Sequence, residues 1–216
     1  MRLIAEGLSA KRGEDLIFND ISFVLDASEA LVVTGPNGSG KSTLLRVLAG
    51  LLRPERGHVK LEGGPPEIAH PSEVSHYLGH RNAMKRELTV AENLSFWQRF
   101  MGNSPGGAGV GIADAVEAVG LPDIAHLPFG YLSAGQQRRM AMAKLLVSHR
   151  PIWILDEPTA ALDAGADRLF AELVKAHLEK GGIVIAATHQ PLGLNRTREL
   201  HMKGFEHLAG DHWHDA

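Results

Sequence analysis

The sequence contains no cysteine and no long apolar run. Without cysteine the chain can form no disulfide, use no catalytic thiol and hold no cysteine-ligated metal. Nowhere do about 18 apolar residues follow one another, as a membrane-spanning helix requires. The residues from Met1 to Glu6 lack the apolar core of a signal peptide. We therefore expect a protein that is soluble and cytoplasmic by itself.

The sequence also lacks a large excess of either charge. Its formal net charge is −3, whereas a dedicated nucleic-acid-binding protein is usually strongly basic. No nucleic acid partner is expected. A chain of 216 residues with 44% hydrophobic content can bury one good core. A single domain spanning residues 1–216 is therefore predicted.

Residues 35–42 fit the phosphate-binding pattern G-x-x-x-x-G-K-[ST]. An apolar run at 30–34 precedes them, and apolar residues at helical spacing follow them: Leu44, Leu45, Val47, Leu48 and Leu51. With this strand and helix on either side, an ordinary glycine-rich turn is a poor explanation. The pattern predicts a P-loop that binds a polyphosphate through backbone N–H groups and a lysine. The predicted phosphate-binding residues, which the family resemblance described below assigns to ATP, are Gly35, Pro36, Asn37, Gly38, Ser39, Gly40, Lys41, Ser42 and Thr43. Ser42 is also a predicted Mg²⁺ ligand.

The remaining pattern predicts an α/β fold. Apolar residues alternate with polar ones around Phe23 and Val59, which is typical of half-exposed antiparallel strands near the N-terminus. Continuous apolar runs at 30–34, 152–155 and 183–188 predict a core of parallel strands. Between about residues 81 and 131 helical spacing dominates, broken by glycine and proline after Met101, so a helical insert is expected there.

A second acidic motif follows the apolar run 152–155. Asp156 would lie at the carboxyl end of a buried parallel strand, where ligands bind, and it could hold Mg²⁺. Glu157 would face the terminal phosphate and act as the general base of hydrolysis. The alternative for Glu157 is a surface carboxylate before Pro158.

A third motif identifies a family. Ser133 before a helix is explained by N-capping alone, but Leu132-Ser133-Ala134-Gly135-Gln136 also resembles the signature sequence of ATP-binding cassette (ABC) ATPases, with alanine at its third place. Asp163 after Ala161-Leu162 resembles the D-loop of that family, and His189 resembles its switch histidine. Five motifs in the family's order cover nearly the whole chain.

The resemblance implies a P-loop ABC cassette that hydrolyses ATP with Mg²⁺. It also implies a dimer in which Ser133, Ala134, Gly135 and Gln136 of one copy cap the ATP held by the P-loop of the other. Glu157 and His189 are the implied catalytic residues. Asp163 is expected at the dimer contact, although it would equally serve as the N-cap of the helix that follows.

Two positions depart from the usual cassette pattern. Spacing places His80 where most cassettes have the Q-loop glutamine, and imidazole is a poor ligand for Mg²⁺. Spacing also places Arg12 where the family has an aromatic residue that stacks on adenine. A guanidinium can stack on a base, although with less apolar area than tyrosine.

Within the ABC family the chain resembles the haem exporter ATP-binding subunit of bacterial cytochrome c maturation. The segments that carry this resemblance are 77–80 and 132–139. It implies integral membrane subunits as partners, and a peripheral location on the cytoplasmic face of the inner membrane. His201, His207, His212 and His214 near the end of the chain lack a clear ligand spacing, so we interpret them as a solvated tail.

Three alternatives stay open at this point. One is an ABC ATPase that powers a different transporter, and another is a soluble ABC ATPase that acts on nucleic acid or ribosomes. The third, a P-loop kinase or nucleotide-binding regulator, fits least, because a kinase needs no signature sequence in trans.

Overall fold

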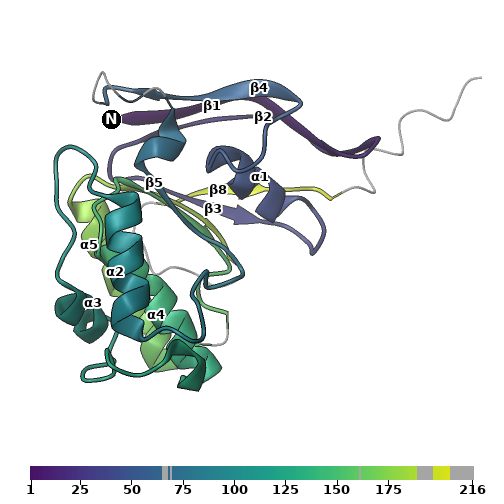
Figure 1. Ribbon diagram of the computed structural model, residues 1–216. Helices are drawn as coiled ribbons and strands as arrows, with labels where there is room; N and C mark the ends of the chain where they lie inside the picture. The colour runs from purple at the N-terminus through teal and green to yellow at the C-terminus, as the bar shows by residue number, and fades with distance from the viewer. Residues whose placement is uncertain (65–67, 69, 161, 189–196, 205–216) are drawn as a thin grey trace, which may run out of the picture.

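The computed structural model describes residues 1–64, 68, 70–160, 162–188 and 197–204. In these residues an antiparallel sheet, a parallel sheet and a group of helices lie in successive layers (Figure 1). The strands are β1 (Arg2–Arg12), β2 (Asp15–Asp26), β3 (Ala30–Thr34), β4 (Arg56–Glu62), β5 (Ser75–Leu78), β6 (Ile152–Asp156), β7 (Ile183–Ala187) and β8 (Thr197–His201). The helices are α1 (Lys41–Leu48), α2 (Val90–Met101), α3 (Ile112–Ala118), α4 (Ala134–Leu146) and α5 (Ala164–Glu179), with short 3-10 helices η1 (Pro71–Val74) and η2 (Phe129–Tyr131).

The antiparallel sheet has the strand order β2-β1-β4. Every second residue of β2 and β4 turns inward: Leu25 and Val59 are buried, while Ile21, Phe23 and Leu61 are half-buried. The sequence predicted these strands from the same alternation of apolar and polar residues. The prediction of an antiparallel N-terminal layer is confirmed.

The second sheet is parallel throughout, in the order β5-β6-β7-β3-β8. Its three central strands, β6, β7 and β3, are the three that the sequence predicted from continuous apolar runs. The edge strands β5 and β8 were not predicted, because β5 is short and contains a histidine and a tyrosine, while β8 is mostly exposed and polar. A doubly covered parallel sheet confirms the α/β class.

The parallel sheet separates two cores. Ile152 and Ile154 of β6 pack with α1 and the antiparallel sheet, so that α1 lies between the two sheets (Figure 1). Trp153 and Leu155 point to the opposite face and pack against α2, α3, α4 and α5. One strand therefore supplies alternate side chains to both cores.

The helical segment between residues 81 and 131 has the expected elements. Thr89 begins α2 with a reciprocal capping box to Glu92, and the helix ends before Gly102, whose φ is 60°. Val90 and Leu94 are buried, as their spacing predicted.

One helical prediction is wrong. Leu51 lies beyond the end of α1 and is 63% exposed. The helical spacing continues past Gly50 in the sequence, but Gly50 takes a φ of 69°, which ends the helix.

Candidate active site

The P-loop joins β3 to the N-terminus of α1 through glycines in left-handed backbone conformations. Gly35 has a φ of 132° and Gly40 a φ of 94°, which residues with a side chain rarely adopt. A Cβ atom on Gly35 would lie 2.3 Å from the carbonyl oxygen of Met202, so only glycine fits. The loop therefore has the backbone that a phosphate-binding cradle requires.

Lys41, the first residue of α1, is buried and turns back over this loop. Its ammonium group donates to the carbonyl oxygens of Gly35 at 2.7 Å and of Pro36 at 3.1 Å. These contacts hold the positive charge at the mouth of the cradle, where phosphate oxygens would compete for it.

Asp156 ends β6 and faces the first turn of α1. The Ser42 hydroxyl donates to one of its carboxylate oxygens at 3.0 Å, and the Tyr77 hydroxyl lies 3.4 Å from the other. Burial raises the pKa of Tyr77, which keeps its hydroxyl protonated. Ser42 and Asp156 thus present adjacent oxygen ligands, the type that Mg²⁺ prefers, so these residues fit that ion.

Glu157 has an unusual backbone conformation. Its φ of 46° is in the left-handed region, which costs about 1 kcal/mol or more for a residue with a side chain. Its amide N–H donates to the carbonyl oxygen of Ala187 at the end of β7. The neighbouring strand therefore helps to hold Glu157 in a strained position at the tip of the sheet.

One cavity of about 680 Å³ collects most of the predicted nucleotide site. It is lined by Asn37, Gly38 and residues 40–43 of the P-loop, by Asp156 and Glu157, and by the exposed Arg12 from the end of β1. The sequence predicted these residues from separate motifs, and the fold brings them together.

His80 lies in a different cavity, of about 590 Å³, on the side of β5 and α2. It is exposed, and Arg46 of α1 is the residue that lines both cavities. His80 is therefore near the nucleotide cavity without lining it.

The signature segment does not line the P-loop cavity of its own chain. Ser133 is exposed and caps α4: the Gln136 amide donates to its hydroxyl at 3.3 Å, and its own amide donates to the Gln136 side chain at 2.9 Å. Asp163 caps α5 by accepting from the Ala166 amide at 2.8 Å, a bond that lowers the pKa of its carboxyl group. Both capping expectations are confirmed.

Some predicted residues cannot be placed. His189 and Ala161 lie outside the described residues, as do His207, His212 and His214. The interpretation of His201 as part of a solvated tail is wrong: it ends β8, which pairs with β3, and its Nδ1 atom is 3.1 Å from the Thr34 hydroxyl. Among the described residues, no group of three or more His, Asp or Glu side chains is arranged to hold a metal ion.

Sequence reasoning missed Arg138. This buried arginine of α4 donates to five oxygen atoms, those of Asp156 O, Glu157 O, Pro158 O, Gly79 O and Asn82 Oδ1. It therefore joins α4 to the backbone of Asp156 and Glu157 and to the segment that precedes His80. In the sequence it is one of two adjacent arginines on a helix, and no local pattern distinguishes it from Arg139.

The sequence profile of the ABC transporter family matches residues 18–160. The chain belongs to the ABC transporter family. Curated relatives include the cytochrome c biogenesis ATP-binding export protein CcmA of Rhizobium meliloti, 76% identical over 96% of this chain and 100% of the relative. The CcmA protein of Brucella abortus is 57% identical over 90% of this chain and 88% of the relative.

Solved ABC structures have the same fold. The bacterial ABC transporter cassette MJ0796, solved as a dimer, superposes with a TM-score of 0.78 at 25% identity, covering 93% of this chain and 94% of that one. A putative ABC transporter ATP-binding protein from Pyrococcus furiosus gives a TM-score of 0.77 at 24% identity, over 93% and 98% of the two chains. The chain is therefore an ATP-hydrolysing ABC cassette, and its fold is that of the family, as the sequence predicted.

No helix among the described residues of this cassette combines the length and apolar character needed to cross a bilayer.

Proposed function

We propose that this cassette is the ATPase subunit of a membrane-bound ABC complex that acts in cytochrome c biogenesis and haem export. Relatives named cytochrome c biogenesis ATP-binding export protein match nearly the full chain and support this proposal. The mechanism is supported by the separation of the signature segment from the P-loop cavity within one chain. P-loop residues, Asp156 and Glu157 line that cavity, whereas Ser133 is exposed and does not line it. A second copy is needed to supply the signature.

In the proposed reaction the P-loop amides and Lys41 bind the phosphates of ATP, and Arg12 stacks on the base. Ser42 and Asp156 would hold Mg²⁺, which neutralises phosphate charge when bound. Glu157 accepts the proton of the attacking water. His189, which is assigned by resemblance alone, would orient that water.

The proposed assembly is a two-fold dimer with two ATP molecules at its interface. The N-terminus of α4, capped by Ser133, would face the nucleotide of the second copy through Ser133, Ala134, Gly135 and Gln136. Asp163 lies at the N-terminus of α5 and would contact the same partner. Hydrolysis removes the phosphate charge that holds the two copies together, so ATP binding closes the dimer and hydrolysis opens it.

The proposed membrane partners are integral subunits that recruit the cassette to the cytoplasmic face of the inner membrane. Residues 81–131 connect His80, which lies near the nucleotide cavity, to the signature segment, so a movement of this helical insert would be linked to both. Cell fractionation tests the recruitment. The cassette should leave the membrane fraction in cells that lack the membrane subunits, and unchanged membrane association in those cells would contradict this part of the proposal.

The chemistry is tested by Glu157→Gln. The amide keeps the shape of the side chain but cannot accept a proton, so turnover should stop while ATP binding persists. ATP-dependent dimers should then accumulate in size-exclusion chromatography. ATP hydrolysis by Glu157→Gln at a rate near that of the wild type would show that Glu157 is not the base.

A further inference from the structure

The nucleotide cavity has no aromatic side chain among its described lining residues. Beside the P-loop and the two acids, it is lined by charged and aliphatic residues: Lys11, Arg12, Asp15, Ile17, Arg46 and Leu52. A base has two flat faces, and proteins commonly cover such a face with an aromatic ring. Arg12 can cover one face of the base, because a guanidinium group is also flat. The described lining of this cavity provides no ring for the other face.

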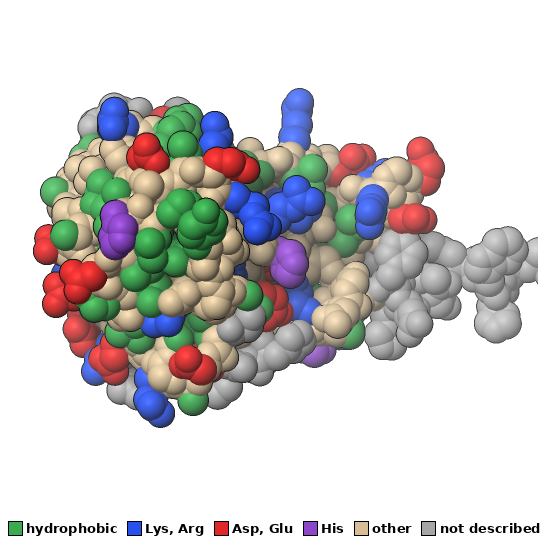
Figure 2. Space-filling view, turned by 60° about the horizontal axis from the view of Figure 1, so that its bottom comes forward, with side chains coloured by type: hydrophobic (Ala, Val, Ile, Leu, Met, Phe, Trp, Pro, Cys, Tyr) green, Lys and Arg blue, Asp and Glu red, His purple; other side chains and the backbone are tan. Residues whose placement is uncertain are grey.

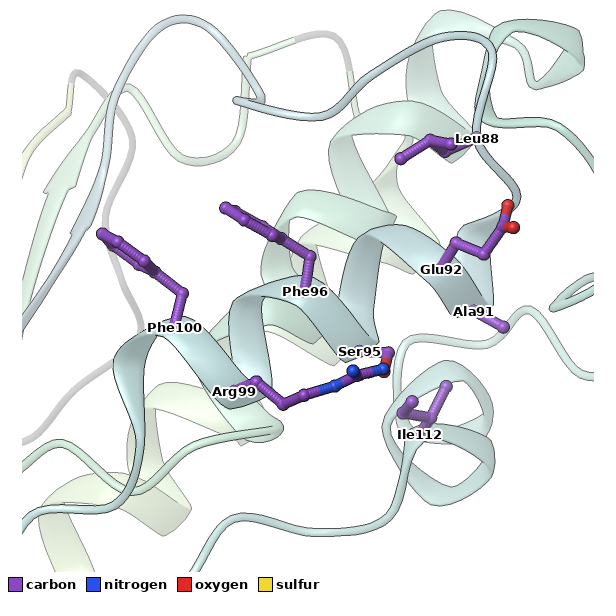
Figure 3. Close-up of a pocket in the computed structure, with 8 residues that line it drawn as sticks. All are labelled: Leu88, Ala91, Glu92, Ser95, Phe96, Arg99, Phe100 and Ile112. Carbon is purple, nitrogen blue, oxygen red and sulfur yellow. The ribbon is translucent and has the colours of Figure 1, made fainter.

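An exposed aromatic ring is not by itself evidence of a binding site. Figure 2 shows hydrophobic side chains exposed together on one face of the molecule. Phe96 and Phe100 project from the same side of α2 and stack with ring centroids 5.6 Å apart (Figure 3). They line a cavity of about 820 Å³ that shares no described residue with the nucleotide cavity. These two rings are therefore no candidates for the base of a nucleotide in their own chain.

Tyr131 differs from these rings in its position beside the signature segment. It ends η2, two residues before Ser133, and it is 82% exposed. None of the aromatic ring pairs formed by the described residues includes it. Two residues of chain span at most about 7 Å. When Ser133 meets the phosphates of a nucleotide, Tyr131 can therefore meet another part of the same molecule.

The backbone around Tyr131 is fixed to α4. Its neighbours Phe129 and Leu132 are buried, although Tyr131 itself is exposed. The side-chain amide of Gln137 in α4 donates to the carbonyl oxygen of Leu132 at 2.9 Å and to that of Phe129 at 3.4 Å. The segment that carries Tyr131 is therefore held to the helix that Ser133 caps, so the ring has a defined place relative to the signature segment.

We infer that Tyr131 of one copy stacks on the base of the nucleotide held by the second copy. The base then lies between this ring and Arg12 of the chain that binds its phosphates. The inference rests on the proposed dimer, and it adds that each base is bound by residues of both copies. Every base has a flat face, so the ring contributes affinity and does not choose between purines.

The contact exists only in the closed dimer, because the two residues that meet the base belong to different copies. A separate copy therefore binds nucleotide without the ring, and closure of the dimer adds one ring to each base. Loss of the ring should weaken ATP-dependent dimer formation and leave nucleotide binding by the separate copies unchanged.

Dimer formation is measured by analytical ultracentrifugation of the purified cassette with ATP and Mg²⁺, in the Glu157→Gln background. Tyr131→Ala should raise the dissociation constant of the dimer roughly tenfold or more. Tyr131→Phe keeps the ring and should restore most of the affinity. The control Phe96→Ala removes an exposed ring of α2 and should dimerise like the parent. At protein concentrations too low for dimers, all four proteins should bind ATP equally.

A fluorescent base reports the stacking directly. The triphosphate of 2-aminopurine riboside loses fluorescence when its base stacks on another ring. In the Glu157→Gln background this fluorescence should fall when the dimer closes, and Tyr131→Ala should abolish the fall. An excess of Lys41→Ala, whose own P-loop is inactive but whose Tyr131 is intact, should restore it. This rescue occurs only if the ring comes from the second copy.

The outcomes separate the inference from the proposed function. If Tyr131→Ala dimerises like the parent and its probe fluorescence falls equally, the ring is not part of the site, and the shared dimer stands. If Lys41→Ala does not restore the fall, the ring acts within its own chain and the inference is overturned. If Glu157→Gln forms no ATP-dependent dimer at all, the proposed dimer fails and the inference fails with it.

Discussion

The Arg138 guanidinium group donates to the carbonyl oxygen of Glu157 at 2.6 Å, within the buried layer below the nucleotide cavity. The same group donates to the carbonyl oxygen of Gly79 at 2.9 Å. One cation therefore fixes the backbone of the proposed general base and the backbone next to His80. A shift of α4 would be transmitted to both segments, because Arg138 is part of that helix.

The role of Arg138 in positioning can be tested with Arg138→Lys. Lysine keeps the charge but lacks the planar fork that reaches several carbonyl groups at once. We expect kcat to fall roughly tenfold to a hundredfold with little change in KM, because Glu157 would be misplaced while the P-loop stays intact. Steady-state ATPase kinetics measure both constants.

The matched control is Arg139→Lys. Arg139 is adjacent, but it donates to the carbonyl oxygen of Gly120 at 3.1 Å instead of to the backbone of Asp156 and Glu157. Its replacement should leave kcat nearly unchanged. Equal effects of the two substitutions would show that Arg138 has no special link to Glu157.

Sharing of the active site between two copies predicts recovery of activity in a mixture. Lys41→Ala removes phosphate binding, and Ser133→Arg places a large cation where the second copy's nucleotide would lie. Each homodimer should be inactive, while mixed dimers contain one intact site. ATPase activity in the mixture, measured after time for subunit exchange, should exceed that of either variant. Full activity of Ser133→Arg alone would disprove sharing.

The cap of α5 predicts different effects of two replacements at Asp163. Asp163→Ala removes the acceptor for the Ala166 amide and should lower the free energy of unfolding by about 1 kcal/mol. Asparagine is an equally good cap, so Asp163→Asn should retain most of the stability. Urea unfolding measures both. If both variants lose ATPase activity although Asp163→Asn stays stable, Asp163 also serves the dimer contact.

A buried histidine predicts acid sensitivity. His76 is 1% exposed, its Nε2 atom is 2.9 Å from the carbonyl oxygen of Ser148, and burial lowers its pKa from 6.5 to about 3. Between these pH values the unfolded chain binds a proton that the folded chain does not. The free energy of unfolding therefore falls as pH drops below 6.5, by about 1.4 kcal/mol per pH unit for one proton.

The measurement compares wild type with His76→Gln, in which the amide can still donate to Ser148. Burial also lowers the pKa of His177, to about 4, but this residue is present in both proteins and cancels in the difference. The variant should lose less stability than the wild type between neutral and acidic pH. Parallel stability curves would show that His76 is not the source of the acid sensitivity.

Most of the residues predicted for the nucleotide site line one cavity, and the sequence could name them because they belong to local patterns. The glycines of the P-loop adopt backbone conformations that other residues rarely adopt, so the loop is recognisable from its own residues. Asp156 is recognisable because it directly follows a continuous apolar run. Caps such as Ser133 and Asp163 are equally local, since each bonds to an amide three residues away.

Other features depend on distant parts of the chain. In the sequence, Arg138 and Lys144 look like ordinary charged residues of a helix. Arg138 is buried because α4 packs against the ends of β5 and β6. Lys144 is buried because β5 and α2 pack against α4. His80 was aligned by spacing, but spacing does not show which cavity a side chain enters. Leu51 was misassigned because periodicity alone does not show where a glycine ends a helix.

The alternation of side chains along β6 has a consequence for how the molecule melts. Because Ile154 supports one core and Trp153 the other, loss of either core removes half of the packing of the same strand. We therefore expect the layers to unfold in one cooperative transition, which calorimetry would show as a single peak. A nucleotide bound on the P-loop side stabilises the folded state as a whole, so it should slow amide hydrogen exchange in the distant helices as well.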